Sequence, residues 1–146
     1  MQKNEILLLN RMYQDATVGM LAIDKVLKKT KREDLKKLFQ KQYSMYEKFA
    51  SKCDAVAMSN DKEVKENSVF KKFKQSAMLY MSLWMDNSSR HIVEMMIAGT
   101  SMGIVDTIKA EKDMPVKNEE LTEMVHEFKK IQEDFYEKLK KQLAKV

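Results

Sequence analysis

The feature that most constrains this sequence is a row of apolar residues near its beginning, repeated at alternating steps of three and four. The row consists of Ile6, Leu9, Tyr13, Ala16, Met20, Ile23 and Leu27. Because an α-helix turns once every 3.6 residues, these side chains share one face, and heptad spacing is typical of helices packed side by side. The 146 residues include only three glycines and one proline, so little interrupts long helices. The sequence predicts an all-α protein with a single domain over residues 1–146.

The first two long helices are expected to form a hairpin. The first begins near Asn4 and ends near Lys29, and Thr30 to Glu33 has the form of a capping box that would start the second helix. So short a link makes the two helices antiparallel neighbours. The second helix carries its own seam, formed by Leu35, Phe39, Gln42, Tyr46, Phe49, Cys53 and Val56.

A second hairpin is expected in the other half of the chain. Its first helix covers Ser89–Ala110, whose apolar residues fall on every side and predict coverage by neighbours on several faces. Its second helix is capped by Asn118, after a short link that contains Pro115. Roughly 30 residues join the two hairpins, and a short helix over Phe70–Trp84 can run back along most of the bundle at about 1.5 Å per residue.

This layout resembles the ferritin-like superfamily, and most closely its short bacterial members of unknown function. The resemblance rests on Leu9–Leu27, Leu35–Cys53 and His91–Ala110, and it is one of helix layout and rhythm rather than of a specific motif. It implies a ferritin-like four-helix bundle whose long connection between the second and third long helices contains a short extra helix.

A ferritin-like layout makes a di-metal carboxylate centre the sharpest chemical hypothesis, since such centres use inward Glu residues and Glu-x-x-His pairs. The chain has one such pair, Glu123 and His126, which helical geometry places opposite the apolar stripe of its helix, facing water. The second helix offers Gln42 where a ligand would stand, and the first offers only Glu5 and Asp24 beside its seam. The sequence therefore predicts no intact di-iron centre, and the resemblance carries over neither ferroxidase activity nor iron storage.

Glu94 is the carboxylate that stands apart. It aligns with apolar residues of the Ser89–Ala110 helix, which suggests an inward position, and His91 lies one turn before it. A buried carboxylate needs a partner or a raised pKa. Two interpretations stay open: a structural Glu paired with a Lys, a Tyr or Gln42 across the bundle, or a metal site formed by Glu94 and His91. The second would make the protein an iron- or manganese-dependent oxidoreductase or storage protein.

Other unusual residues favour structural roles. Cys53 lies on an apolar seam, which predicts a buried and unreactive thiol. The 13 methionines are typical of an adaptable core, although Met78 and Met81 have the spacing of a copper(I) site. Gly99 and Gly103 stand four apart and predict close approach of a neighbouring backbone or large side chain. With so little glycine and no nucleophile motif, we expect no cofactor.

Charge and composition address location and partners. Of 27 basic residues only three are arginines, and the net charge is +5. Because base and phosphate recognition favours arginine, this mixture predicts a solvated surface rather than a nucleic-acid site. One cysteine, no signal-peptide pattern and no long apolar run predict a cytoplasmic protein without a membrane span. We expect binding rather than catalysis, by self-association or with a protein partner, and the aromatic and methionine content of Phe70–Trp84 favours a homodimer.

Overall fold

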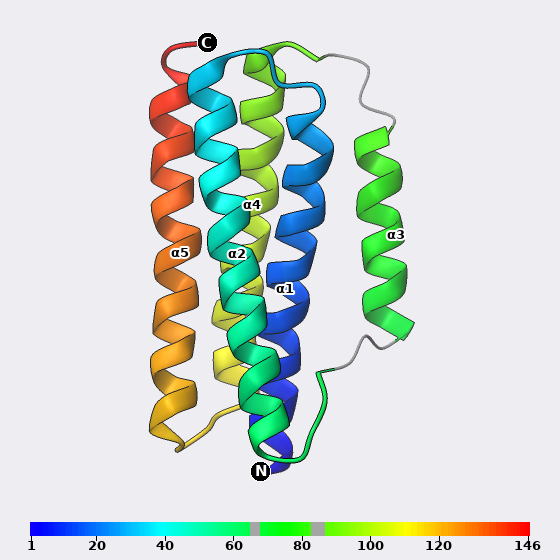
Figure 1. Cartoon of the computed structure of the whole chain (residues 1–146), viewed down its shortest axis with the longest axis vertical. Coiled ribbons are helices and arrows are strands. Elements are labelled where there is room, and N and C mark those ends of the chain that lie inside the picture. The colour runs from blue at the N-terminus through cyan, green and yellow to red at the C-terminus, as the bar shows by residue number, and fades with distance from the viewer. Residues whose placement is uncertain (65–67, 83–86) are drawn as a thin grey trace.

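The structure, a computed structural model, describes residues 1–64, 68–82 and 87–146, and every regular element in these ranges is an α-helix (Figure 1). The helices are α1 (Lys3–Leu27), α2 (Glu33–Ser59), α3 (Ser68–Ser82), α4 (Ser89–Asp113) and α5 (Glu119–Leu143). The prediction of an all-α protein is confirmed. Within the described ranges, no helix combines the length and the apolar character that crossing a membrane requires.

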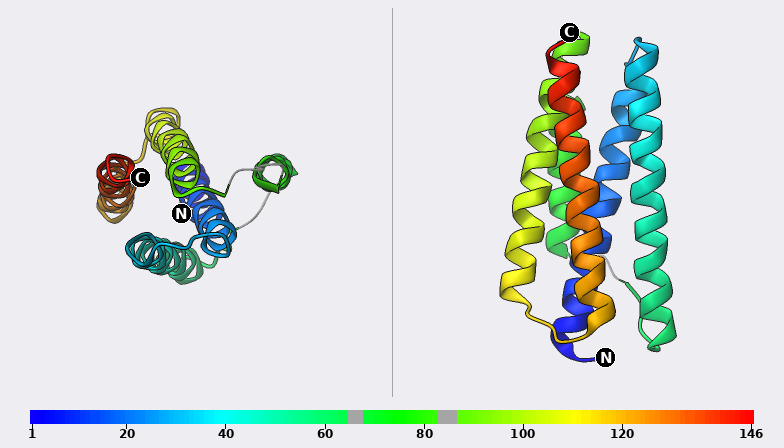
Figure 2. Two further views of the ribbon diagram at one scale, coloured as in Figure 1. Left: turned by 90° about the horizontal axis from the view of Figure 1, so that it is seen from above. Right: turned by 90° about the vertical axis from the view of Figure 1, so that its left-hand side faces the viewer.

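Helices α1, α2, α4 and α5 lie side by side around a common core, whereas α3 lies outside it (Figures 1 and 2). Among the described residues, α3 contacts α1 alone. The pairs α1–α2 and α4–α5 are antiparallel hairpins, and α4 runs in the same direction as α2 because α3 leads back along the bundle (Figure 1). Viewed from above, the order around the core is α1, α2, α5 and α4 (Figure 2).

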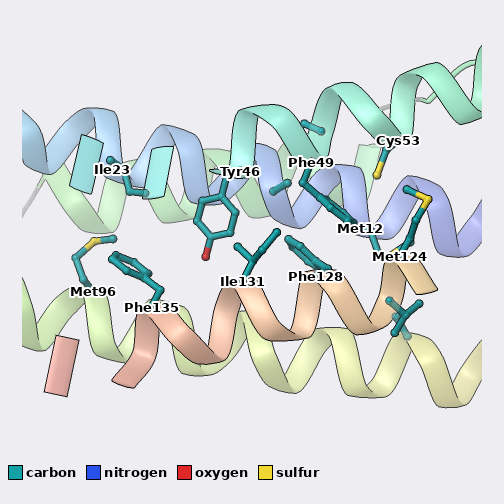
Figure 3. Packing of buried hydrophobic residues seen from close by; sticks show 14 of the residues in the cluster. Met12, Ile23, Tyr46, Phe49, Cys53, Met96, Met124, Phe128, Ile131 and Phe135 are labelled. Carbon is teal, nitrogen blue, oxygen red and sulfur yellow. The ribbon is translucent and has the colours of Figure 1, made fainter. Parts of the chain in front are cut away.

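Aromatic side chains join α2 to α5 at the centre of the core (Figure 3). The Phe128 ring stacks on Phe49 with centroids 4.6 Å apart, and it meets the edge of Tyr46 at 6.2 Å. Such pairs add to the free energy gained by burying their apolar area. The large side chains that are almost fully buried come from α1, α2 and α5: Leu8, Leu9, Met12, Ile23, Leu35, Phe39, Phe49, Leu121, Met124, Phe128, Phe135 and Leu139.

The helix ends confirm two predicted caps and correct a third. The side chains of Ser88 and Asn118 accept hydrogen bonds from backbone N–H groups three residues later, at 3.3 and 3.1 Å. The predicted capping box at Thr30 is wrong. Its hydroxyl donates to the carbonyl oxygen of Val26 at 2.6 Å, so Thr30 closes the end of α1, and α2 begins at Glu33 without a side-chain cap.

The aromatic side chains on which the prediction of a homodimer depends lie outside the described residues. These are Phe70, Phe73, Tyr80 and Trp84. What the structure does describe in α3 is a helix of 15 residues set against α1, which agrees with the expected short helix in the long connection.

Candidate functional site

Glu94 and His91, the predicted metal ligands, lie in the first turns of α4 with side chains 39% and 42% exposed. The Oε1 atom of Glu94 accepts a hydrogen bond from Nε of Arg90 at 3.0 Å, and its Oε2 atom lies 3.8 Å from Nδ1 of His91. Glu94 is thus paired within its own helix and not with Gln42 or another residue across the bundle. Because Arg90 already neutralises this carboxylate, it competes with any cation for the same oxygens.

The Glu-x-x-His pair of α5 lies where the sequence predicts. Glu123 and His126 are both exposed on the outer side of α5. Within the described ranges, no group of three or more His, Cys, Asp and Glu side chains is placed to hold a metal ion.

Cys53 is a buried thiol, as predicted, with no exposed surface. Burial raises the pKa of Cys53 to about 12. Since the thiolate is the nucleophilic form, this thiol is unreactive at neutral pH.

The centre of the bundle contains neutral polar groups. Nε2 of Gln42 donates to the carbonyl oxygen of Ile131 at 3.3 Å. Burial raises the pKa of Tyr46 to about 12, against the effect of a hydrogen bond with Gln42. Gln132 is 2% exposed, and its Oε1 atom has no hydrogen-bond partner. Amides and a phenol are weak ligands for a hard cation, so this layer supports packing specificity more readily than metal chemistry.

A charged cluster joins α1 to α4 at the edge of this polar layer. The Arg11 guanidinium forms a fork on Asp106, with Nε donating to Oδ2 at 2.8 Å and Nη2 donating to Oδ1. Asp106 also shares a hydrogen bond with Asp15 of α1. The Oδ2 atom of Asp15 is buried without a partner.

The two carboxyl groups of this cluster divide one proton unequally. Burial, together with the hydrogen bond and the negative charge of Asp106, holds the pKa of Asp15 well above its usual value. Burial also opposes ionisation of Asp106, but hydrogen bonds from Arg11 and Asp15 outweigh it, so the pKa of Asp106 lies below its usual value. Asp15 therefore keeps the proton and donates it to the Asp106 carboxylate.

The sequence analysis missed Asp15, although the spacing carries a signal. The core side of α1 includes a second row at steps of four and three: Leu8, Met12, Asp15, Gly19, Ala22 and Val26. Leu8, Met12 and Val26 are buried, whereas Ile6 and Leu27 of the predicted seam are only partly buried. A carboxylate in the middle of such a row indicates a buried acid that needs a partner.

The outer face of α4 is apolar. We use this name for Ala98, Gly99, Met102, Val105 and Ile108, which are all exposed. Met102 is 62% exposed, Val105 47% and Ile108 48%. A shallow hollow of about 270 Å³ lies there, lined by Ser101, Met102, Val105, Asp106 and Lys109. In the described part of the chain, α4 contacts only α1 and α5, so no helix covers this face.

The two glycines of α4 differ in their surroundings. A Cβ atom on Gly103 would lie 3.2 Å from Nε2 of Gln132, which agrees with the predicted close approach of a large side chain. A Cβ atom on Gly99 would meet nothing within 4 Å, so that prediction is wrong for Gly99 within a single chain. The small size of Gly99 is unused in the monomer.

Comparison with known proteins adds no relative from which a function could be transferred. The chain matches no protein-family model, no curated protein sequence and no solved structure. Function must therefore be inferred from the residues themselves.

Proposed function

We propose that this chain is a ferritin-like four-helix bundle without a di-iron centre, which acts by binding another protein chain through the outer face of α4. Two antiparallel hairpins joined by one long connection, with α2 and α4 parallel, support the ferritin-like assignment. The paired Glu94 and the neutral polar layer support a bundle that does not work through a di-iron centre.

The exposure of Met102, Val105 and Ile108 carries the proposal. These large apolar side chains lie within two turns of one another and surround a hollow, while α5 exposes no comparable group. A contiguous apolar patch on a soluble domain marks an interaction surface. Burying it against another chain would release the water that now covers it.

Photocrosslinking inside the cells from which the gene comes tests this proposal. A photoreactive phenylalanine derivative replaces Met102 in one variant and Glu133, on the outer side of α5, in a matched control. We expect light-dependent protein adducts from position 102 and none from position 133. Equal adducts from both positions, or none from either, would contradict a binding role for the outer face of α4.

Binding of iron or manganese by Glu94 and His91 is the competing function. Elemental analysis of the purified chain, after incubation with ferrous iron or manganese and desalting, separates the two. The proposal expects far less than one metal ion per chain. A near-stoichiometric ion that is lost in Glu94→Ala would replace it with a metal-dependent role.

A further inference from the structure

Helix α4 carries two apolar seams on opposite faces. The inner seam follows steps of three and four through Val93, Met96, Thr100, Gly103, Thr107 and Ala110. All of its side chains are buried against the bundle. The outer seam follows steps of four and three through His91, Met95, Ala98, Met102, Val105, Lys109 and Lys112. Two such rows on one helix indicate two packing partners, of which the bundle supplies one.

The outer seam is apolar in its middle and charged at its ends. Met95 to Val105 span about 15 Å along the helix axis. Glu94 flanks the N-terminal end of the seam, and Lys109 and Lys112 form its C-terminal end. Within the part of the chain that the structure describes, neither lysine forms an ion pair. The seam thus presents an acidic end and a basic end about 22 Å apart.

We propose that the outer seam of α4 binds the same seam of a second copy of this chain, with the two helices antiparallel and a two-fold axis beside Met102. In this register Met102 meets the partner's Met102, and Ala98 meets the partner's Val105. The small Ala98 and the open Gly99 leave room for Val105 and let the two backbones approach. This inference rests on the proposed function, because it names the chain that the outer face of α4 binds.

Charge selects the antiparallel arrangement. It places Glu94 beside the partner's Lys109, and this contact occurs twice because the interface is symmetric. The aliphatic part of Lys109 then covers the partner's Met95 while its ammonium group reaches Glu94. A parallel pair would set Lys109 against Lys109 and Lys112 against Lys112. Like charges in such positions are destabilising, so the parallel arrangement is disfavoured.

The apolar contact is short, which sets the expected affinity. One helix pair over about 20 Å buries less area than a standard stable interface, so we expect a dissociation constant on the order of 10 µM. The dimer would then form and separate reversibly as the protein concentration changes.

Sedimentation equilibrium over about 1 µM to 1 mM protein measures this dimer and its charge pairing. Val105→Glu should abolish dimerisation, because it places two carboxylates in the apolar middle of the interface. Lys109→Glu should weaken dimerisation about tenfold, and adding Glu94→Lys to the same chain should restore it, since both contacts then regain opposite charges. Lys138→Glu, an exposed lysine of α5, is the matched control and should leave the dimer unchanged. Circular dichroism checks that each variant is folded.

Disulfide trapping in the full chain tests the register. Mixed and oxidised, the variants Ala98→Cys and Val105→Cys should form a disulfide mainly with each other, because the antiparallel pair brings these positions together. Each variant joined mainly to itself would overturn the antiparallel arrangement. Glu133→Cys on α5 is the control and should remain monomeric, and the buried Cys53 should not compete.

These results separate this inference from the proposed function. A chain that stays monomeric up to about 1 mM overturns the second copy as the partner. If position 102 still crosslinks in cells to a protein of different mass, binding through the outer face of α4 stands and only the partner is wrong. If position 102 gives no adduct in cells either, both fail. Dimerisation that Val105→Glu abolishes, together with an adduct of twice the chain mass, supports both.

Discussion

Helices α4 and α5 form one hairpin and have the same length, 25 residues, yet they use their apolar residues differently. In α5 every large apolar residue of the central turns is buried, and its outer side is charged. In α4 the buried positions include two threonines and an alanine, while Met102, Val105 and Ile108 are exposed. The apolar residues of α5 stabilise the single chain, whereas those on the outer face of α4 contribute little until something covers them.

The largest effect should come from the inner side of α5. Phe128→Ala should lower the free energy of unfolding by about 3–5 kcal/mol, because it removes a ring that contacts Phe49 and Tyr46 and leaves a cavity. Met102→Ala, the same kind of truncation on α4, should cost less than about 0.5 kcal/mol in dilute protein. Urea unfolding followed by circular dichroism measures both. Equal losses would contradict the contrast between the two helices.

The next effect concerns the charged contact that ties α4 to α1. Asp15 holds its proton above its usual pKa of 3.8, so folding takes up a proton and stability falls as pH rises through that value toward the raised folded pKa. Asp15→Asn keeps a donor for Asp106 but removes this dependence. The variant should match the native chain near pH 4 and exceed its unfolding free energy at pH 8 by on the order of 1 kcal/mol.

Urea titrations from pH 4 to pH 8 measure this difference, with Asp24→Asn as the control. Asp24 is an exposed carboxylate on the same helix, and its replacement should give a difference that does not grow with pH. A constant gap between Asp15→Asn and the native chain would show that Asp15 is ionised in the folded protein.

A smaller effect should separate the two faces of α4 itself. Gly99→Ala should raise the unfolding free energy by about 0.5–1 kcal/mol, since alanine favours the helix and nothing lies nearby. Gly103→Ala should be about 1 kcal/mol less stable than Gly99→Ala, because its methyl group meets the buried amide of Gln132. Thermal unfolding of dilute protein compares them. A Gly99→Ala chain that is the less stable of the two would place Gly99 against an unseen neighbour.

The smallest effect should come from the outer side of α5. Nζ of Lys52 lies 2.7 Å from Oε2 of Glu127, but both side chains are almost half exposed. Glu127→Gln should therefore cost about 0.5 kcal/mol at low salt, and this difference should vanish near 1 M salt. A loss that persists at high salt would mean that this contact is shielded from solvent.

The same contrast explains what the sequence could predict. The stripe of α5 has one period and one apolar side, so its buried residues follow from spacing alone. Helix α4 has two equally periodic seams, and only the positions of α1 and α5 decide which one is buried. Asp15 was missed because its partner lies 91 residues away on α4, and Thr30 was misassigned because its hydroxyl can close the helix before it as well as start the next.

The position of α3 has a consequence for the folding pathway. The most extensive helix contacts lie within α1–α2 and within α4–α5, and α3 contacts α1 alone among the described residues. Each hairpin can form from residues close in sequence, which gives the chain a low contact order and favours rapid folding. The encounter of the two hairpins brings Phe128 to Phe49 and Asp106 to Arg11. We therefore expect the rate-limiting barrier to lie in the docking of two preformed hairpins, with α3 acting as the tether that keeps them within reach.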